Sequence, residues 1–286
     1  MSELALERIA ENKKTKATTL DLGDCGLTEL PEALFECIWL EELYLSSTWE
    51  DYITYNALVL GSTHNAGESN NIKFLPNDIS NLCFLKKLYI GGEQGENWSL
   101  NDLSPIAELG KLEILDFSYT MVNDLGPLSR LSNLECIFCG STLIKDLSPL
   151  VDLKKLKYIF CGLTKIKDLS PVAKIKSLTH LFCFETLIED ISGLRTLDNL
   201  QEFSCSYTKV IDLAPIRSLV NIQALALNSS RVTDLSPILP LIKKGKVVKW
   251  QEYHMGGISV HNCPLVIPPI EFAQAGNEAV LEYFDQ

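Results

Sequence analysis

The 286-residue sequence has only four histidines and lacks any long apolar run. His64, His180, His254 and His261 are scattered without the spacing of metal ligands, which argues against a metalloenzyme. No apolar run approaches the roughly 18 residues of a membrane span, and the chain starts with a charged amphipathic segment in place of a signal-peptide core. We therefore expect a cytoplasmic protein with no membrane partner.

A surplus of basic residues is also absent. The chain has 25 Lys and Arg against 37 Asp and Glu, which gives a net charge of −12. Binding to a phosphate backbone relies on clustered cations, so we expect no nucleic-acid partner. The densest basic segment, residues 243–249, is short, and we interpret it as a solvated loop.

Motifs of catalysis and nucleotide binding are missing as well. The sequence contains no GxxxxGK[ST] phosphate loop, and the glycine run at residues 91–95 lacks the lysine of such a loop. It contains no HExxH motif and no residue pattern that marks a nucleophile. We expect a non-enzymatic protein that uses no metal and no cofactor.

The most informative feature of the sequence is a period of 22 residues. Position 1 of six successive units is apolar: Leu112, Leu134, Leu156, Leu178, Leu200 and Ile222. Positions 4 and 6 are apolar in every unit, and position 9 is Thr in the first five units and Ser in the last. Position 13 is always aspartate: Asp124, Asp146, Asp168, Asp190, Asp212 and Asp234. Irregular upstream units bring the count to nine, with a tenth, degenerate strand near residues 258–260.

Each unit is expected to form one short strand and one tight turn. Positions 3 to 7 alternate, so positions 4 and 6 point inward and positions 3 and 5 face solvent. We expect Ser148 to be an N-cap, with Pro149 at the first position of a short helical or 3₁₀ turn. The apolar residue at position 20 closes the core on the far side. One unit cannot bury its apolar face alone, so the units are expected to stack into an α/β solenoid with a parallel sheet on one face.

This consensus, LxxLxxLxxL followed by TxIxDLSPL, resembles the leucine-rich repeat in its short, 22-residue internalin-like variety. The resemblance covers about residues 18–260. It implies a curved horseshoe with a parallel sheet on the concave face, short 3₁₀ or helical turns on the convex face and helical caps. Position 9 departs from the usual Asn, but a threonine hydroxyl can still bond backbone groups in a stacked ladder.

Both ends resemble bacterial leucine-rich-repeat proteins of the Roco (LRR-Roc-COR) family. The start reads ALERIAENKKTKATTLDLGDCGLTELPEALFE. The tail carries His-Asn-Cys-Pro-Leu from residue 261, Pro-Pro-Ile-Glu from residue 268 and Tyr283-Phe284, and it is similar to the segment that connects the repeats to a Roc GTPase domain. Cys263 between Asn and Pro departs slightly from that pattern.

We expect a single domain over residues 1–286. Residues 1–16 form an N-terminal helical cap that lays Leu4, Leu6 and Ile9 across the first unit. Nine to ten repeats follow at 17–260, with insertions at 49–71 and 91–98. Residues 261–286 form a C-terminal cap or linker, with one helix over 270–284. The candidates for its buried face are Phe272, Ala279, Val280, Tyr283 and Phe284.

Cysteine and aspartate each recur at one repeat position. Cys139, Cys161, Cys183 and Cys205 stand at the inward position 6, where cysteine packs as a small apolar residue, and a straight ladder cannot wrap a tetrahedral metal ion. The chain has nine cysteines, and we expect free thiols in a reducing compartment. Aspartate at a turn entry bonds neighbouring backbone N–H groups, so we interpret the position-13 residues as a structural ladder.

The candidate functional surface is the face formed by positions 3 and 5. Aromatic side chains on adjacent strands are expected to form an exposed patch there, which is typical of a protein-binding site. The predicted partner-binding residues are Tyr44, Tyr89, Phe138, Tyr158, Phe160, His180, Phe182 and Phe184. The alternative is that these rings only stiffen the sheet, or that an inserted loop of the same chain covers them.

The two insertions leave the chain just after adjacent strands. The longer one carries Trp49, Tyr52, Tyr55 and His64, and the shorter one carries Trp98. Long loops in compact folds are usually functional or mobile. We expect the two insertions to form a lip beside the N-terminal part of the concave face.

These features predict a non-catalytic recognition module that binds a protein or a peptide. The Roco resemblance implies the N-terminal regulatory portion of a signalling GTPase, which contacts an adjoining Roc-COR module in cis or self-associates. The alternative is a self-standing adaptor or effector that is complete at Gln286. An enzyme with a site grafted onto the repeats is disfavoured, since no catalytic motif is present.

Overall fold

The computed structural model of the 286-residue chain describes all residues except 1, 52–58, 94, 96 and 251–256. The chain divides into two compact units. Unit 1 comprises Met1–Ile144 and Asp152–Leu156, and unit 2 comprises Lys145–Val151 and Lys157–Gln286. No helix in the described part of the chain is both long and apolar enough to cross a membrane.

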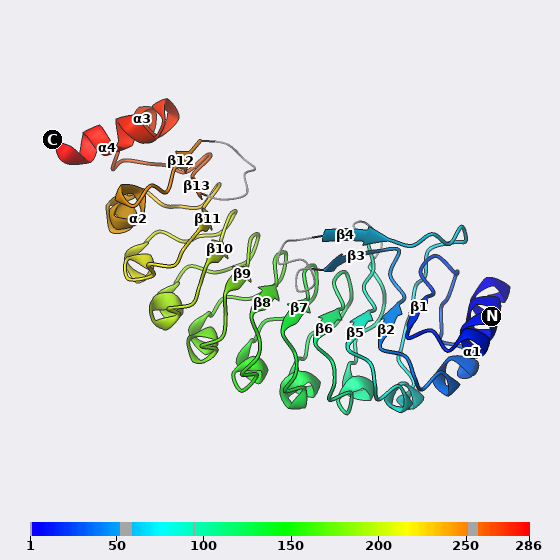
Figure 1. Ribbon diagram of the computed structural model, residues 1–286. Coiled ribbons are helices and arrows are strands. Elements are labelled where there is room, and N and C mark those ends of the chain that lie inside the picture. Colours follow the sequence, from blue (N-terminus) through cyan, green and yellow to red (C-terminus); the bar gives the residue numbers. More distant parts are fainter. Residues whose placement is uncertain (1, 52–58, 94, 96, 251–256) are drawn as a thin grey trace. The chain divides into compact units, whose positions relative to one another are not determined.

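Unit 1 is built from short parallel strands joined by 3₁₀ turns (Figure 1). Its elements are α1 (Glu3–Thr15), β1 (Thr19–Asp21), η1 (Glu32–Glu36), β2 (Glu42–Tyr44), β3 (Thr48–Asp51), β4 (Val59–Ser62), η2 (Asn77–Asn81), β5 (Lys87–Tyr89), η3 (Ser104–Ile106), β6 (Ile114–Asp116), η4 (Gly126–Arg130) and β7 (Cys136–Phe138). The parallel sheet runs β1-β2-β5-β6-β7, and β3 and β4 form a separate antiparallel hairpin.

Unit 2 continues the same pattern of strand and turn. Its elements are η5 (Ser148–Leu150), β8 (Tyr158–Phe160), η6 (Ser170–Lys174), β9 (His180–Phe182), η7 (Ser192–Thr196), β10 (Glu202–Ser204), η8 (Ala214–Ile216), β11 (Ala224–Ala226), η9 (Ser236–Ile238), α2 (Leu239–Lys243), β12 (Val248–Lys249), β13 (Gly257–Ser259), α3 (Ile270–Ala275) and α4 (Asn277–Asp285). Its strands run β8-β9-β10-β11-β13-β12. The predicted α/β repeat solenoid and its degenerate strand near residue 258 are confirmed, and β12 is an addition that the pattern did not predict.

The core lies between the strands and the 3₁₀ turns, as the period predicted. The side chains at positions 4 and 6 are buried in every regular unit, and Leu181 and Cys183 are examples with no exposed surface. Position 20 is buried as well: Leu131, Leu153, Ile175, Leu197, Leu219 and Leu241. Removal of these apolar surfaces from water in unit after unit supplies the main driving force for the stack.

The position-13 aspartates cap the turns, as predicted. In seven repeats, including the one that contains Asp102, the aspartate Oδ1 atom accepts a hydrogen bond from the backbone N–H two residues later at 2.7–2.8 Å. The predicted N-cap at Ser148 is wrong, because Ser148 is the first residue of η5 and Leu147 occupies the cap position. The side-chain acceptor comes instead from Asp146, one residue further upstream, which already satisfies the Ser148 N–H.

The position-9 threonines bond the backbone, as expected, but within their own unit. Each hydroxyl donates to the position-6 carbonyl three residues earlier at 2.6–2.7 Å. The residue before each position-9 Thr or Ser, at position 8, has a left-handed backbone. Its φ is 51–58° in six successive repeats, although none of the six residues is glycine. In unit 2 the Leu163 N–H at this position donates to the Phe184 carbonyl of the next unit, so stacking helps to hold this conformation.

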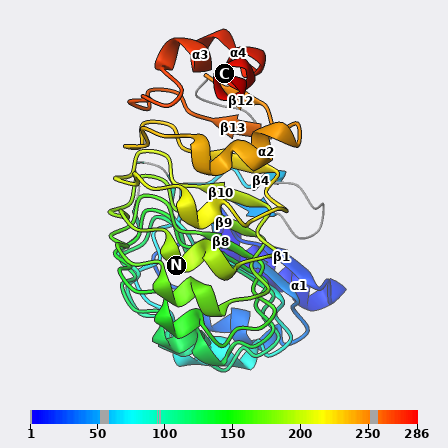
Figure 2. The same cartoon turned by 90° about the vertical axis from the view of Figure 1, so that its left-hand side faces the viewer.

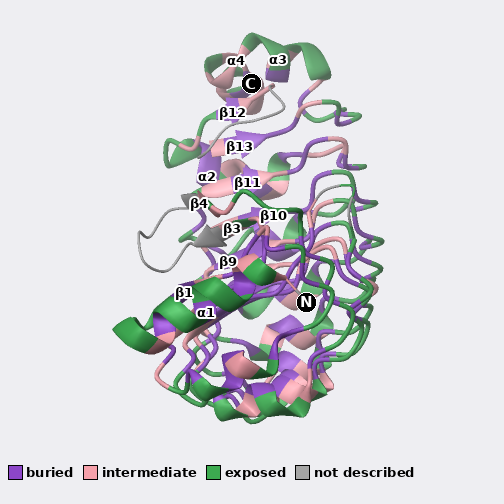
Figure 3. Cartoon of the chain, turned by 90° about the vertical axis from the view of Figure 1, so that its right-hand side faces the viewer, coloured by how far each residue is buried: buried purple, intermediate pink, exposed green. Residues whose placement is uncertain are grey.

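The N-terminal helix α1 caps the first repeat. Ser2 accepts a hydrogen bond from the Ala5 N–H at 3.3 Å, and Ala5 and Ile9 are buried. Figure 3 shows the remainder of α1 largely exposed. Leu6 is 36% exposed, so its predicted place in the cap interface is wrong. Asn12 is buried instead, where it donates to the Ala17 carbonyl at 3.0 Å.

The C-terminal cap consists of two helices, where the sequence predicted one. The helix is interrupted at Gly276, whose φ of 104° favours glycine. This residue separates α3 from α4, and both helices lie beside β12 and β13 (Figure 2). Val280 is fully buried and the aromatic candidates of the tail are half-buried. The basic segment 243–249 is not simply a loop, since it contains the end of α2 and β12. Lys243 pairs with Asp285 of α4 at 2.8 Å.

Candidate recognition surface

In unit 1 the predicted aromatic surface is buried. Tyr44 is 8% exposed, Tyr89 is 0% exposed and Phe138 is 2% exposed. Asp116, at the same repeat position on β6, is also buried. The expectation that positions 3 and 5 face solvent is therefore wrong for these residues, although they do lie on the opposite side of the strands from positions 4 and 6.

The β3–β4 hairpin covers the first of these rings. Trp49 on β3 lies against Tyr44, with ring centroids 4.3 Å apart, and its centroid is 6.2 Å from that of Tyr89. Tyr44 and Tyr89 stack on each other at 4.8 Å. Gly61 on β4 allows the indole to lie close, because a Cβ atom there would come within 2.3 Å of Trp49 Nε1. Coverage by the chain's own insertion, the alternative to an open aromatic patch, thus describes this part of unit 1.

The rest of the longer insertion fastens the hairpin to the first repeat. Thr63 Oγ1 donates to Asp21 Oδ2 at 2.8 Å, and Asn65 Nδ2 donates to the Gly23 carbonyl at 2.7 Å. The buried Asn70 donates to the Leu22 carbonyl at 2.8 Å. The part of the insertion that follows the hairpin is therefore hydrogen-bonded to the first repeat. The predicted contributions of Tyr52 and Tyr55 fall on residues outside the described part of the chain.

The shorter insertion ends before Trp98, contrary to the predicted boundary. Trp98 is 3% exposed, and its backbone forms a parallel bridge with Thr120, the position-9 residue of the next unit. Its indole occupies the ladder position in the core, so it is not part of a lip. Counting back from Leu100 and Asp102, which are the position-11 and position-13 residues, would have revealed this placement.

In unit 2 five of the predicted side chains lie on β8, on β9 and at the second residue after β9. We call them the ring cluster: Tyr158, Phe160, His180, Phe182 and Phe184. Phe160 stacks on Phe182 at 4.6 Å with an interplanar angle of 10°, and Tyr158 stacks on His180 at 4.6 Å. The three phenylalanines are half-buried, whereas Tyr158 and His180 are 6% exposed.

Gly162 is a further residue of this surface that the sequence reading missed. It stands at position 7 of its unit, where the next unit carries Phe184. A Cβ atom on Gly162 would come within 2.6 Å of the Phe184 ring. Glycine at this position therefore lets the ring lie flat across the neighbouring strand. The signal was available in the sequence as the pairing of a residue without a side chain with a large one.

A buried imidazole and a half-buried carboxylate border the ring cluster. Burial lowers the pKa of His180 to about 4, so its imidazole is neutral at physiological pH. Burial also raises the pKa of Glu202 on β10. His180 Nε2 lies 3.9 Å from Glu202 Oε1, and His180 Nδ1 lies 2.8 Å from Thr179 Oγ1. A neutral imidazole gives the carboxylate no ionic partner.

The position-6 cysteines lie in the core, as predicted. Cys139, Cys161, Cys183 and Cys205 have no exposed surface, and burial raises the pKa of Cys161 and Cys205 to about 12. Thiols that hold their protons so strongly are poor nucleophiles and poor metal ligands. Among the described residues, which exclude His254, no three His, Cys, Asp or Glu side chains are arranged to hold a metal ion.

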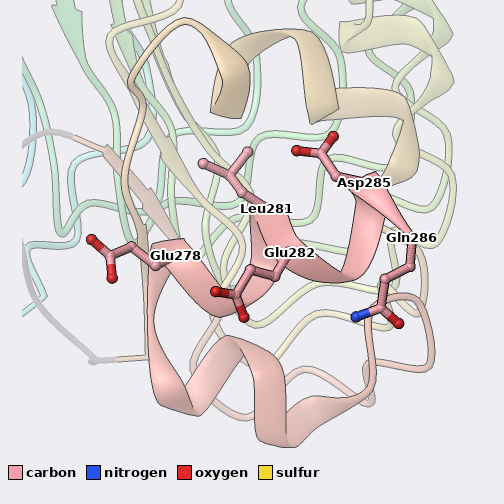
Figure 4. A pocket seen from close by; sticks show the side chains of 5 residues that line it. All are labelled: Glu278, Leu281, Glu282, Asp285 and Gln286. Carbon is pink, nitrogen blue, oxygen red and sulfur yellow. The ribbon is translucent and has the colours of Figure 1, made fainter.

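A shallow depression of about 500 Å³ lies on α4. It is lined by Glu278, Leu281, Glu282, Asp285 and Gln286 (Figure 4). Glu278 and Glu282 are exposed, Asp285 pairs with Lys243 at 2.8 Å, and the depression contains no residue of the predicted surface. The ring cluster is therefore the better candidate for a recognition site.

Comparison with solved structures identifies the fold. Internalin C2 from Listeria monocytogenes is similar to this chain, with a TM-score of 0.63 and 23% identity over 79% of this chain and 93% of that chain. The internalin inlF from the same organism has a TM-score of 0.61 and 18% identity, over 92% and 83%. No family model and no curated protein matches the chain. The fold is that of a leucine-rich-repeat domain.

Proposed function

We propose that the protein is a non-catalytic recognition module that binds a protein or a peptide through the ring cluster of unit 2. The observation that supports this most is the stack of half-exposed phenylalanines on β8 and β9, where Phe160 and Phe182 lie 4.6 Å apart. Rings held by neighbouring strands lose little side-chain entropy when a partner binds, and aromatic anchors contribute much of the energy of interfaces.

Within this proposal the predicted site is smaller than the sequence suggested. Phe160, Phe182 and Phe184 are half-buried, and Tyr158 and His180 lie beside them, two residues earlier on the same strands. Tyr44 and Tyr89 contact Trp49 of the β3–β4 hairpin, which takes the place of a partner there. We propose that residues 1–286 form one repeat domain in which unit 2 provides the binding surface.

The test is selection of peptides from a random phage-displayed library on the purified chain. Binders are expected to weaken at least tenfold when Phe160, Phe182 and Phe184 are all changed to Ser, because the anchoring rings are lost. The matched control changes Leu163 and Leu187 to Ser, since these side chains are 43% and 40% exposed in the same unit but lie outside the ring cluster. Failure to select any binder, or binders that ignore the ring changes, would contradict this function.

We further propose that the module regulates a neighbouring domain of a Roco-like protein in the cytoplasm. The support is the sequence of the tail, which resembles the connector to a Roc GTPase domain, together with its half-buried aromatic side chains on α3 and α4. An immunoblot of native lysate measures the size of the polypeptide that carries this chain. A band far above 31.9 kDa is expected, whereas a band at 31.9 kDa would favour a self-standing adaptor.

A further inference from the structure

The ring cluster ends abruptly at β9. Phe182 is in register with Ser204 on β10, which is in register with Ala226 on β11. Ser259 on β13 continues the same row. Phe182 thus has the Phe160 ring on one side and only small side chains on the other. No described ring other than those of the cluster lies against Phe182.

A carboxylate stands beside this open face. Glu202 lies two residues before Ser204 on β10, so both side chains point to the same face of the sheet and are roughly 7 Å apart along the strand. Glu202 is half-buried beside His180, its register partner on β9, while Ser204, at 8% exposed, lies beside Phe182. Within the described residues the one basic group near its carboxylate is the imidazole of His180, at 3.9 Å.

We propose that an arginine side chain of the partner inserts above Ser204, where it stacks on Phe182 and pairs with Glu202. This inference rests on the proposed function, because it assigns a chemistry to the partner of the same surface. Neighbouring strands are about 4.8 Å apart, so a planar group above β10 continues the spacing at which Phe160 and Phe182 already stack.

Arginine fits this position better than other cations do. Its guanidinium is planar and weakly hydrated, so it stacks on an aromatic face and can at the same time present paired N–H donors to a carboxylate. The ammonium of lysine is a compact and strongly hydrated charge that matches only the carboxylate. A neutral planar ring would match Phe182 but leave the half-buried Glu202 without a partner.

The experiment uses the library-selected peptides and the full chain. Peptides with an arginine whose change to lysine weakens binding at least tenfold are expected. Glu202→Gln should remove most of that difference between arginine and lysine, because the charge is lost while the shape stays. Ser204→Phe should weaken binding at least tenfold, because its own ring would occupy the space above β10. The control Glu185→Gln removes one exposed carboxylate of the same unit and should leave affinity unchanged.

The outcomes separate this inference from the proposed function. Binders that need Phe160, Phe182 and Phe184 but tolerate arginine-to-lysine changes and Glu202→Gln would overturn the arginine site and leave the recognition surface intact. Binders that ignore the rings would overturn both. If Ser204→Phe fails to fold, as judged by its thermal unfolding, the conservative Glu202→Gln variant decides the question alone.

Discussion

At the scale of single residues, neighbouring positions on one strand face opposite environments. Leu181 on β9 is fully buried in the core, and Phe182 next to it is half-buried in the ring cluster. Alternation along the strand therefore assigns the first side chain to the core and the second to the proposed recognition surface. The sequence predicted this register from the period alone, since positions 4 and 6 are apolar in every regular unit.

This register predicts unequal costs for two adjacent truncations. Leu181→Ala should lower the free energy of unfolding by about 2–5 kcal/mol, through lost transfer energy and the cavity that remains. Phe182→Ala should cost about 1 kcal/mol, since its ring is partly in water already and loses mainly its stacking on Phe160. Urea denaturation measures both values. Equal losses would indicate that the strand register is shifted by one residue.

The buried Asp116 predicts a dependence of stability on pH in unit 1. Burial raises the pKa of its carboxyl from 3.8 to about 6, although the Ser118 N–H donates to it at 2.9 Å. The folded state therefore holds this proton more tightly than the unfolded state does. The cost in folding stability of ionising the buried carboxyl is absent below about pH 4, grows up to about pH 6 and is complete above that.

The Asp116→Asn variant should remove this penalty, since the amide oxygen can still accept the Ser118 N–H without a charge. The variant should gain stability over the natural chain as pH rises from 4 to 6, by an amount on the order of 3 kcal/mol or less, and keep that gain at pH 8. Urea denaturation at several pH values gives the difference. A constant difference across this range would show that another group controls the response.

At the scale of elements, contact with the β3–β4 hairpin distinguishes Tyr44 and Tyr89 from the half-buried rings of unit 2. The period assigns Tyr44 and Tyr89 to an outward face, and it assigns Phe160 and Phe182 to the same face in later units. Only contacts from outside the repeat decide which of these rings meet solvent. Residues 48–62 have no counterpart in other units, so no comparison between repeats could have predicted where the Trp49 indole lies.

Trp49→Ala should therefore uncover a surface that the natural chain keeps closed. Tyr44 loses its contact with the indole, and its reaction with N-acetylimidazole should rise several-fold, as measured by mass spectrometry of the acetylated peptide. Tyr207, already 44% exposed, serves as the internal reference for reagent access. Unchanged reactivity of Tyr44 would mean that other parts of the insertion cover it without help from Trp49.

At the scale of the whole molecule, the periodic residues were predictable and the aperiodic ones were not. The inward leucines, the turn aspartates and the core cysteines repeat, so each unit confirms the assignment of the next. Most errors arose where the period is interrupted or ends, at Trp98, in the hairpin and in the C-terminal cap, whereas the N-cap at Ser148 and the burial of Phe138 were missed inside regular repeats. At these places non-local packing decides the conformation, and a single sequence carries little information about such contacts.

A repeat protein needs covered ends, and this requirement gives the last prediction. Val280 on α4 is fully buried, and α4 packs against α2 and β12 at the end of unit 2. Val280→Asp places a charge in that interface and should detach the cap, because an unpaired buried carboxylate costs several kcal/mol. The expected result is a lower unfolding temperature with increased binding of the dye ANS to exposed apolar surface. Glu282→Ala changes an exposed residue of the same helix and should leave both measurements as they are. If Val280→Asp also leaves them unchanged, α3 and α4 do not act as a cap, and the stability of unit 2 comes from its repeats alone.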